Sequence, residues 1–448
     1  MTKFVYYLTL LIGKLQRIKG GGTSFPGKVA LRMKPDILKE FKIPEHHVFI
    51  SGTNGKTSTA NYLAEVFRQT GQSVCHNAAG ANLKQGIVSS LLQNSDSSLR
   101  IKSDVLILEI DELTMLNVFP ELNPQHLILT NLFTDQIDRF GDKWQLATTL
   151  SEKLPQGMTL YVNGDDPVLV WLTQQINPKK VVYYGLTAEY SIADTKTKFQ
   201  TEKCPYCNSK LNYEQRYYDS LGKFSCECGF KSPNLDYIAE DIDLIEQQFT
   251  VNYQTYRMAY PQLYLVYNML TVVAYAQETG ISIDLIAKVL SEQTETEGRF
   301  EFLSFNKHSA WLNLVKNPAG INQSLTYLEQ QLTSATENNQ KINLLLAFNN
   351  MYVDGLDSTW LEQADFELLQ SDNLAAIYLA GSLQNIVCEL LKKSGIPENI
   401  IVLIPEQEQL TQAISEMRQS DLPGYFLTNF TMLEPVRTSI LKSSKMTK

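Results

Sequence analysis

An apolar run that passes directly into a glycine loop constrains the fold of this chain more than any other feature. Residues Val48–Ile50 are followed by Ser-Gly-Thr-Asn-Gly-Lys-Thr-Ser-Thr at positions 51–59. A buried strand, a tight turn and a helix fit this order. Glycines let backbone N–H groups surround phosphate oxygens, a helix N-terminus attracts anions, and a lysine neutralises their charge. The segment therefore predicts a nucleotide site at the end of a strand.

The same loop supplies candidate residues for the nucleotide and for a metal ion. The predicted nucleotide-binding residues are Gly52, Thr53, Asn54, Gly55, Lys56, Thr57 and Ser58. Lys56 is expected to stabilise the transferring phosphoryl charge, and the hydroxyl of Thr57 or Ser58 is expected to hold Mg²⁺. Ile50 stands where the common eight-residue phosphate loop requires glycine, so the spacing departs from that form. A glycine-rich turn that contains a lysine by chance is the alternative.

Further strand candidates alternate with helix-length segments, which is typical of a parallel α/β sheet. They lie at residues 105–110, 127–130 and 159–163, and a helical period follows at 264–279. A second α/β unit begins near residue 300, with strand candidates at 310–315, 342–348, 375–379 and 400–403. The predicted fold class is therefore α/β, with a central parallel-sheet domain that carries the phosphate loop and a C-terminal Rossmann-like domain.

These patterns divide the chain into three predicted segments. Residues 1–45 form an N-terminal helix and lead-in, residues 46–299 form an ATP-binding domain, and residues 300–448 form the C-terminal domain. A polar, tyrosine-rich stretch at about 198–234 interrupts the alternation of strands and helices. We expect this stretch to be an insertion into the ATP-binding domain.

Four of the six cysteines lie in two closely spaced pairs within this insertion. Cys204 and Cys207 form the first pair, and Cys226 and Cys228 form the second. Four thiolates at this spacing can meet around one tetrahedral ion, so we expect a zinc ribbon. Four sulfur ligands leave no open coordination position, which favours a structural ion. Redox chemistry and a chance spacing are the alternatives.

The overall charge balance argues against nucleic acid as a ligand. The formal net charge is −9, so the chain has no overall attraction for nucleic acid. Near the start, the apolar run Phe4–Ile12 is flanked by basic residues, but it is about half the ~20 residues that span a bilayer. We expect an amphipathic helix in a cytoplasmic protein, and contact of this helix with a membrane surface stays open.

Several segments resemble the Mur ligase family, whose members join carboxylates to amines through acyl phosphates made with ATP. Residues 52–57 resemble its shortened phosphate loop, and Glu109 at a strand end resembles its Mg²⁺-binding glutamate. Further matches follow in the same order at residues 130–131, 135–138, 163–167 and 298–301. The resemblance implies ATP and Mg²⁺ as cofactors, with Thr57 and Glu109 on the metal. It also places Asn268, as an adenine contact, and Arg299, in a Gly-Arg hinge, among the ATP-binding residues.

Two departures narrow the resemblance to one branch of that family. Gln136 stands in place of a metal-binding histidine, and Asn313–Pro318 stands in place of Asp-x-Ala-His-Asn-Pro. Together with residues 80–82 and 315–320, these departures resemble the MurT branch of the family. The resemblance to that branch covers essentially the whole chain. The branch implies a separate GatD-type glutaminase partner in a heterodimer. It also implies lipid II, at the inner face of the cytoplasmic membrane, as the substrate.

A loop after the strand candidate at 342–348 contains two acids, Asp354 and Asp357. Loops at the carboxyl ends of parallel strands commonly carry function. The corresponding loop of the MurT branch holds an aspartate that orients the histidine of the partner's Cys-His pair, and the resemblance gives this role to Asp354. Asp357 is the fallback. Its structural alternative is to cap a helix that begins near Ser358.

These expectations together describe a ligase that amidates the D-glutamate α-carboxylate of the lipid II stem peptide to D-isoglutamine. Ammonia would come from glutamine that the partner hydrolyses. A stand-alone Mur-type or folylpolyglutamate-type ligase, which adds an amino acid, is the alternative, and the altered segment at 313–318 argues against it. A zinc-ribbon ATPase that binds nucleic acid is a second rival, and the charge balance disfavours it.

Overall fold

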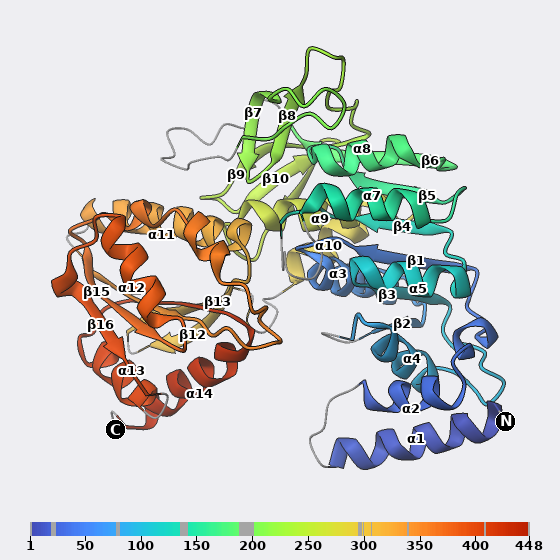
Figure 1. The fold of residues 1–448 in the computed structure, drawn as a ribbon, viewed down its shortest axis with the longest axis horizontal. Helices are drawn as coiled ribbons and strands as arrows, with labels where there is room; N and C mark the ends of the chain where they lie inside the picture. The colour runs from blue at the N-terminus through green and yellow to red at the C-terminus, as the bar shows by residue number, and fades with distance from the viewer. Residues whose placement is uncertain are drawn as a thin grey trace. The chain divides into compact units, whose positions relative to one another are not determined.

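The computed structural model describes residues 2–18, 24–77, 81–134, 142–187, 201–293, 298, 300–305, 307–337, 340–406 and 409–446. The chain folds into two compact units, and most of the second follows Gln293. Each unit has its own mainly parallel sheet and its own helices (Figure 1). The α/β fold class predicted from the sequence is confirmed.

A nine-stranded sheet forms the centre of the first unit among its described residues. Its spatial order is β11-β10-β9-β6-β5-β4-β1-β3-β2. The strands are β1 (His46–Ser51), β2 (Val74–His76), β3 (Val105–Glu109), β4 (His126–Leu129), β5 (Thr159–Asn163), β6 (Lys180–Leu186), β9 (Tyr237–Asp243), β10 (Gln248–Val251) and β11 (Gln254–Arg257). Neighbours from β2 to β9 pair in parallel, and every residue of β3 is buried, as in a sheet covered on both faces.

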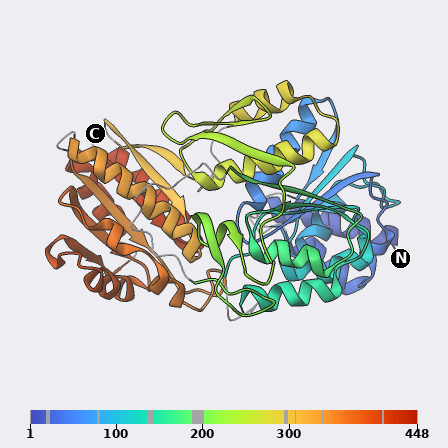
Figure 2. The same ribbon diagram turned by 90° about the horizontal axis from the view of Figure 1, so that it is seen from above.

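Helices cover both faces of this sheet. One face carries α3 (Lys56–Gln69), α9 (Leu263–Glu278) and α10 (Ile283–Glu292), which contact one another. The other carries α4 (Lys84–Gln93), α5 (Glu112–Leu122), α7 (Lys143–Lys153) and α8 (Pro167–Gln175). Figure 2 shows the yellow α9 and α10 on the side of the sheet opposite the green α7 and α8. The helix predicted at 264–279 is therefore confirmed as α9.

Three helical elements precede the sheet: α1 (Thr2–Ile18), α2 (Phe25–Met33) and the 3₁₀ helix η1 (Ile37–Glu40). Pro26 lies in the first turn of α2, where its missing N–H costs nothing. Gly27 brings α2 close to α4, because a Cβ there would clash with the carbonyl of Gln85, and its N–H donates to Ser89 Oγ at 2.7 Å. The helix expected near the N-terminus therefore exists and is part of the first unit.

The predicted insertion contains a hairpin that stands apart from the main sheet. Strands β7 (Asn212–Tyr218) and β8 (Leu221–Ser225) pair only with each other among the described residues. Behind them, Leu211, Phe224 and Phe230 pack with Val170 of α8. A buried ion pair between Lys143 of α7 and Glu202, at 2.7 Å, also ties the insertion to the sheet domain.

A six-stranded sheet forms the second unit among its described residues, in the order β12-β13-β17-β14-β15-β16. The strands are β12 (Glu301–Phe305), β13 (His308–Leu314), β14 (Ile342–Ala347), β15 (Leu374–Ala380), β16 (Ile401–Ile404) and β17 (Gly424–Thr428). Only β12 runs antiparallel to its neighbour. The helical elements are α11 (Pro318–Glu337), η2 (Thr359–Gln363), η3 (Phe366–Leu369), α12 (Gln384–Lys393), η4 (Glu398–Ile400), α13 (Leu410–Gln419) and α14 (Phe430–Met446).

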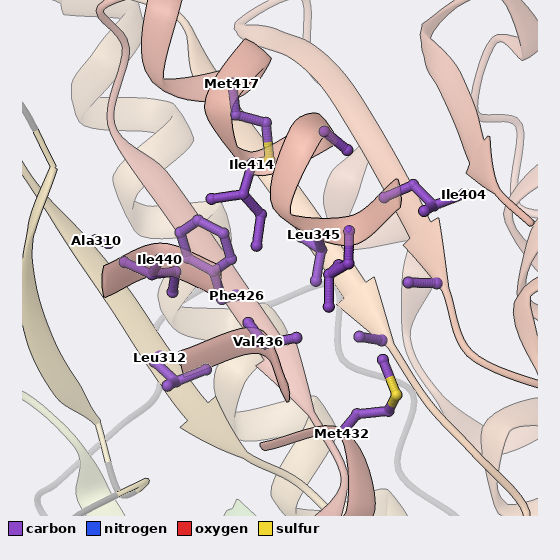
Figure 3. Close-up of a cluster of buried hydrophobic side chains, with 14 of the residues drawn as sticks. Ala310, Leu312, Leu345, Ile404, Ile414, Met417, Phe426, Met432, Val436 and Ile440 are labelled. Atoms are coloured by element: carbon purple, nitrogen blue, oxygen red, sulfur yellow. The ribbon is translucent and has the colours of Figure 1, made fainter. Parts of the chain in front are cut away.

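One core cluster of the second unit lies between its sheet and the helices α13 and α14 (Figure 3). Ile414 and Met417 come from α13, Val436 and Ile440 come from α14, and Phe426 of β17 packs between them. The spacing of three and four residues places each helical pair on one face. This packing fixes the N-terminus of α14 at the edge of the sheet where the strands β14 and β17 end.

Candidate nucleotide site, cysteine cluster and docking loop

The glycine loop joins β1 to α3 as the sequence predicts. Gly52 and Gly55 adopt positive φ angles of 132° and 87°, which favour glycine. A Cβ on Gly52 would clash with Thr130, and a Cβ on Gly55 would clash with the side chain of Asn268. Because the N-cap residue of α3 is glycine, no side chain covers the helix N-terminus there. The loop therefore presents backbone N–H groups in the way that phosphate recognition requires.

Two residues that follow β4 hold this loop in shape. The side-chain Oδ1 of Asn131 accepts from Asn54 N at 2.9 Å, and the backbone carbonyl of Asn131 accepts from Thr53 N at 2.9 Å. The hydroxyl of Thr130 donates to Asn54 O at 2.7 Å. Both side chains are buried. The Thr-Asn pair that the sequence singled out is thus a brace for the loop, and it fixes the loop before any ligand binds.

Lys56 is buried at the N-terminus of α3. Its Nζ donates to the carbonyl oxygens of Gly52 and Thr53, and it lies 3.5 Å from Glu112 Oε1. Glu112 is also buried and is the first residue of α5. The cation therefore sits inside the loop, next to the position that phosphate oxygens would take.

The two predicted magnesium ligands lie next to each other. Thr57 Oγ1 donates to Glu109 Oε2 at 2.7 Å, and Asn82 Nδ2 donates to Glu109 Oε1 at 3.1 Å. Asn77 holds the backbone of Glu109 through two bonds, of 2.7 and 2.8 Å. Glu109 is 3% exposed at the end of β3. A hydroxyl and a carboxylate are the hard oxygen donors that Mg²⁺ prefers, so these residues fit the ion.

The remaining predicted nucleotide residues divide into two groups. Asn268, on α9, is buried against Gly55 of the phosphate loop, and its contact with adenine stays a prediction. Arg299 and residues 135–138 lie outside the described residues. The sequence reasoning did not single out Glu112 or Asn77. Asn77 directly follows β2, and a polar residue at the end of a strand is the signal that could have found it; Glu112 begins α5, and no spacing in the sequence points to it.

Two buried acids follow β5 at the same edge of the sheet. Burial raises the pKa of Asp165 to about 7 and that of Asp166 to about 6. Asp165 Oδ2 accepts from Leu186 N and from the hydroxyl of Tyr267, each at 2.8 Å. Asp166 caps α8 and accepts from Leu132 N at 2.7 Å. These carboxylates connect three strand ends, so their role in this structure is to position the segment next to the phosphate loop.

The four predicted zinc ligands converge. The sulfur atoms of Cys204, Cys207, Cys226 and Cys228 all lie within 4.8 Å of one another. The Cys204–Cys228 and Cys207–Cys226 sulfur distances are both 3.4 Å. Hydrogen bonds from Ser209 lower the pKa of Cys207 to about 6, which favours the thiolate that binds metal. Sulfur atoms at this spacing suit a tetrahedral ion with bonds of about 2.3 Å.

Asp354 lies in the loop after β14 and contacts the N-terminus of α14. Its Oδ1 accepts from Thr431 N at 3.0 Å, and its Oδ2 accepts from Thr431 Oγ1 at 2.6 Å. A carboxylate is favoured at a helix N-terminus. Asp357 Oδ1 instead accepts from Thr359 N at 2.8 Å, which caps a short 3₁₀ helix, η2, in place of the helix expected near Ser358. The two acids therefore have different environments.

Exposed apolar side chains surround Asp354 in sequence. Met351, Tyr352, Val353 and Leu356 are 57%, 84%, 58% and 59% exposed. We call these four residues the docking loop. A cluster of exposed apolar residues on one loop commonly marks an interaction surface.

Two family models match this sequence. The Mur ligase middle domain matches residues 50–276, and the MurT ligase C-terminal domain matches residues 314–433. The MurT subunit of the glutamine-hydrolyzing lipid II isoglutaminyl synthase of Staphylococcus aureus (strain COL) is 30% identical over 443 residues, which cover 98% of this chain and 97% of the relative. The chain belongs to the MurT branch of the Mur ligase family.

Other relatives agree with this assignment. The MurT subunit of Streptococcus pneumoniae (strain ATCC BAA-255 / R6) is 30% identical over 425 residues, 93% of this chain and 92% of the relative. Among solved structures, a pseudomurein peptide ligase type C from Methanothermus fervidus has a TM-score of 0.68 at 19% identity, covering 91% of this chain and 80% of that chain. This likeness supports the fold of the MurT-family chain.

Membership in the MurT branch makes the chain a ligase. The resemblance identified from the phosphate loop and the later motifs is therefore confirmed. Among the described residues of this MurT-family chain, no helix has the length and apolar character to cross a membrane.

Proposed function

We propose that this MurT-family chain is the ATP-dependent amidating subunit of a lipid II isoglutaminyl synthase. The main observation that supports this proposal is the phosphate loop with Thr57 and Glu109 beside it, in a chain that matches MurT subunits over nearly its full length. The proposed substrate is the D-glutamate α-carboxylate of the lipid II stem peptide, and the product is D-isoglutamine. The names of the relatives state the same synthase and its hydrolysis of glutamine.

The proposed reaction has two steps. A carboxylate oxygen of the substrate attacks the γ-phosphorus of ATP, ADP leaves, and an acyl phosphate forms. Ammonia then attacks the acyl carbon, inorganic phosphate leaves with the electrons of the C–O bond, and the nitrogen loses one proton, which the departing phosphate can take up. The loop at 52–58 binds the phosphates, and Lys56 stabilises the charge in transfer. Thr57 and Glu109 would hold Mg²⁺, which supplies neutralising charge to the phosphate oxygens.

A separate glutaminase of the GatD type is the proposed source of ammonia. The docking loop supplies apolar surface for that partner, and Asp354 would accept from the partner's histidine and orient its ring. The two bonds from Thr431 fix the position of the carboxylate and leave its oxygens further acceptor capacity. Asp357, whose Oδ1 already caps η2, is the fallback.

Three further assignments complete the proposal. The zinc ion is structural, because four cysteines close the coordination shell. The segments 1–45, 46–299 and 300–448 are its functional divisions, with the zinc ribbon at about 198–234. The site of action is the cytoplasmic face of the membrane, where lipid II is available.

The test is amidation of lipid II by this chain and its glutaminase, with glutamine or free ammonia as the nitrogen source. We expect Lys56→Ala to fail with both sources. Asp354→Asn keeps the size of the side chain and its acceptor for Thr431 N, and we expect it to fail with glutamine only. Asp357→Asn, the matched control in the same loop, should remain active with both. Full activity of Asp354→Asn with glutamine would overturn the triad assignment.

The same assay separates the proposed function from an amino-acid ligase. Replacing ammonia with free amino acids should give no ligation product. Incorporation of an amino acid in place of ammonia would favour the stand-alone ligase instead.

A further inference from the structure

The helix α1 carries an apolar stripe that its own unit does not bury. Phe4, Tyr7, Leu11 and Leu15 are 63%, 61%, 56% and 53% exposed. Their spacing of three, four and four residues places them on one face of the helix. We call these four residues the α1 stripe. Burying these side chains against a binding partner would remove a large apolar area from water, so the stripe marks an interaction surface.

The opposite face of α1 is firmly packed, so the helix is a fixed part of the first unit. Val5 is fully buried, and the hydroxyl of Tyr6 donates to Ser95 O at 2.9 Å. Thr2 Oγ1 donates to Glu40 Oε2 at 2.8 Å. In Figure 1, α1 lies at the lower edge of the first unit, with α2 between it and α4. The stripe is therefore presented by an ordered scaffold.

The helices α1 and α2 carry only basic charged residues, and Glu40, which contacts Thr2 of α1, is itself paired with Lys34. Residues 1–35 contain seven Lys or Arg and no Asp or Glu, in a chain whose net charge is −9. Lys3 and Lys14 are exposed on α1 itself, and Lys28 and Arg32 are exposed on the neighbouring helix α2. Phe25 of α2 is also 49% exposed. This combination of apolar face and cationic surroundings is complementary to a surface that is both anionic and apolar.

We propose that the α1 stripe docks the protein on the surface of an anionic lipid bilayer. The helix would lie in the plane of the membrane, with its four apolar side chains below the headgroups and the lysines among them. Its 17 residues are too short and too polar to span, in agreement with the lack of a spanning helix among the described residues. A protein partner fits less well, because its surface would have to be apolar and also supply acids to match the exposed cations Lys3, Lys14, Lys28 and Arg32.

The first experiment is co-sedimentation of the full chain with vesicles of equal parts phosphatidylglycerol and phosphatidylcholine. Pure phosphatidylcholine vesicles are the comparison. We expect binding to the anionic vesicles that weakens as salt is raised, because the cationic contribution is screened. Binding that is equal on both vesicles, or absent from both, would overturn the proposal. The vesicles hold no peptidoglycan precursor, so the result is independent of the proposed function.

The second experiment tests the residues. Replacing Leu11 and Leu15 by Ser should weaken vesicle binding by about tenfold or more. The matched control replaces Ile245 and Tyr253 by Ser, because these apolar residues of the same unit are 89% and 102% exposed and lie outside the stripe. Both variants change only exposed positions, and their thermal unfolding checks that they fold.

Equal loss of binding in both variants would contradict a role for the stripe. Light scattering of the full chain tests the other possible partner of the stripe, a second copy of the chain. If the stripe variant changes the molecular mass in solution and leaves vesicle binding intact, the stripe is a face between copies and the membrane proposal is wrong.

Discussion

At the scale of single residues, Lys56 is held by contacts within the phosphate loop itself, the same loop that would bind ATP. Its Nζ donates to the carbonyls of Gly52 and Thr53 and lies near Glu112. These contacts keep a buried cation satisfied without a phosphate. Binding of ATP must therefore exchange carbonyl contacts for phosphate contacts, and only the difference between the two contributes to affinity.

Glu109→Gln tests the predicted metal ligand. The substitution keeps the size of the side chain but removes its charge, next to Thr57 at 2.7 Å. We expect the ammonia-driven amidation rate to fall on the order of 100-fold, and the Mg²⁺ concentration for half-maximal rate to rise. Glu65→Gln, on the exposed side of α3, is the matched control. A wild-type rate and Mg²⁺ dependence in Glu109→Gln would show that this carboxylate does not hold the ion.

Asp165 should make the stability of the first unit depend on pH. Its pKa is about 7 in the folded chain and about 3.9 in an unfolded one, so the folded state binds more protons in that interval. The contribution of this group to the free energy of unfolding should therefore fall as pH rises from about 4 to about 7. We expect Asp165→Asn to reduce this slope, measured by denaturant unfolding at several pH values.

A surface acid provides the comparison for Asp165. Hydrogen bonds from Ser73 lower the pKa of the exposed Asp104, so its titration lies below the same pH interval. Asp104→Asn should leave the slope between pH 5 and 7 unchanged. An unchanged slope in Asp165→Asn as well would mean that another group controls the dependence.

Residue-level prediction worked where a side chain belongs to a local pattern. The sequence named Thr57 and Glu109 separately, and the fold brings their oxygens together because β1 and β3 are neighbours in the sheet. Glu112 could not be chosen in this way. Its approach to Lys56 depends on how α5 leaves β3, and no spacing in the sequence encodes that direction.

At the scale of elements, the cysteine hairpin should depend on its metal. We expect about one zinc ion per chain, and we expect chelation to lower the unfolding temperature, because the ion would join two cysteine pairs that lie far apart in the sequence and would add to the apolar packing behind them. Cys226→Ser should reduce the zinc content. Cys388→Ser, a buried cysteine of α12 outside the cluster, should keep it. Zinc retained at the wild-type level in Cys226→Ser would contradict a four-thiolate site.

The docking loop should control affinity for the glutaminase. Tyr352 is 84% exposed, and exposed aromatic residues often dominate interfaces. We expect Tyr352→Ser to weaken the complex by about tenfold, which is about 1.4 kcal/mol, while the ammonia-driven rate stays unchanged. Titration calorimetry with the partner measures this. The control is Val402→Ser on β16, because Val402 is 40% exposed in the same unit. An equal loss of affinity in that variant would contradict a specific role of the docking loop in binding the partner.

Element prediction was best for buried parallel strands. β1, β3, β4, β5, β13, β14, β15 and β16 lie within a few residues of their predicted positions. The strands β9, β10 and β11 were missed because they mix buried with exposed residues and contain no continuous apolar run. β17 was missed although all five of its residues are buried, since its place between β13 and β14 comes from tertiary packing.

At the scale of the whole molecule, the fold class and the family were accessible because several motifs occur in one order along the chain. The division after Gln293 was less accessible. Nothing in the composition changes there, and the sequence placed the boundary near residue 300 from a strand pattern alone. The position of a boundary depends on which contacts cross it, and single-sequence patterns do not report those contacts.

The segregation of charge described for α1 and α2 has a consequence for diffusion. The first acidic residue of the chain is Asp36, so the whole excess of acids lies after the two basic helices. An anionic surface attracts the exposed cations of these two helices and repels the net negative charge of the rest of the chain. The protein should rotate before it arrives, with its N-terminal helices leading and its acidic remainder repelled. Productive encounters would then be selected by orientation in solution, ahead of any contact.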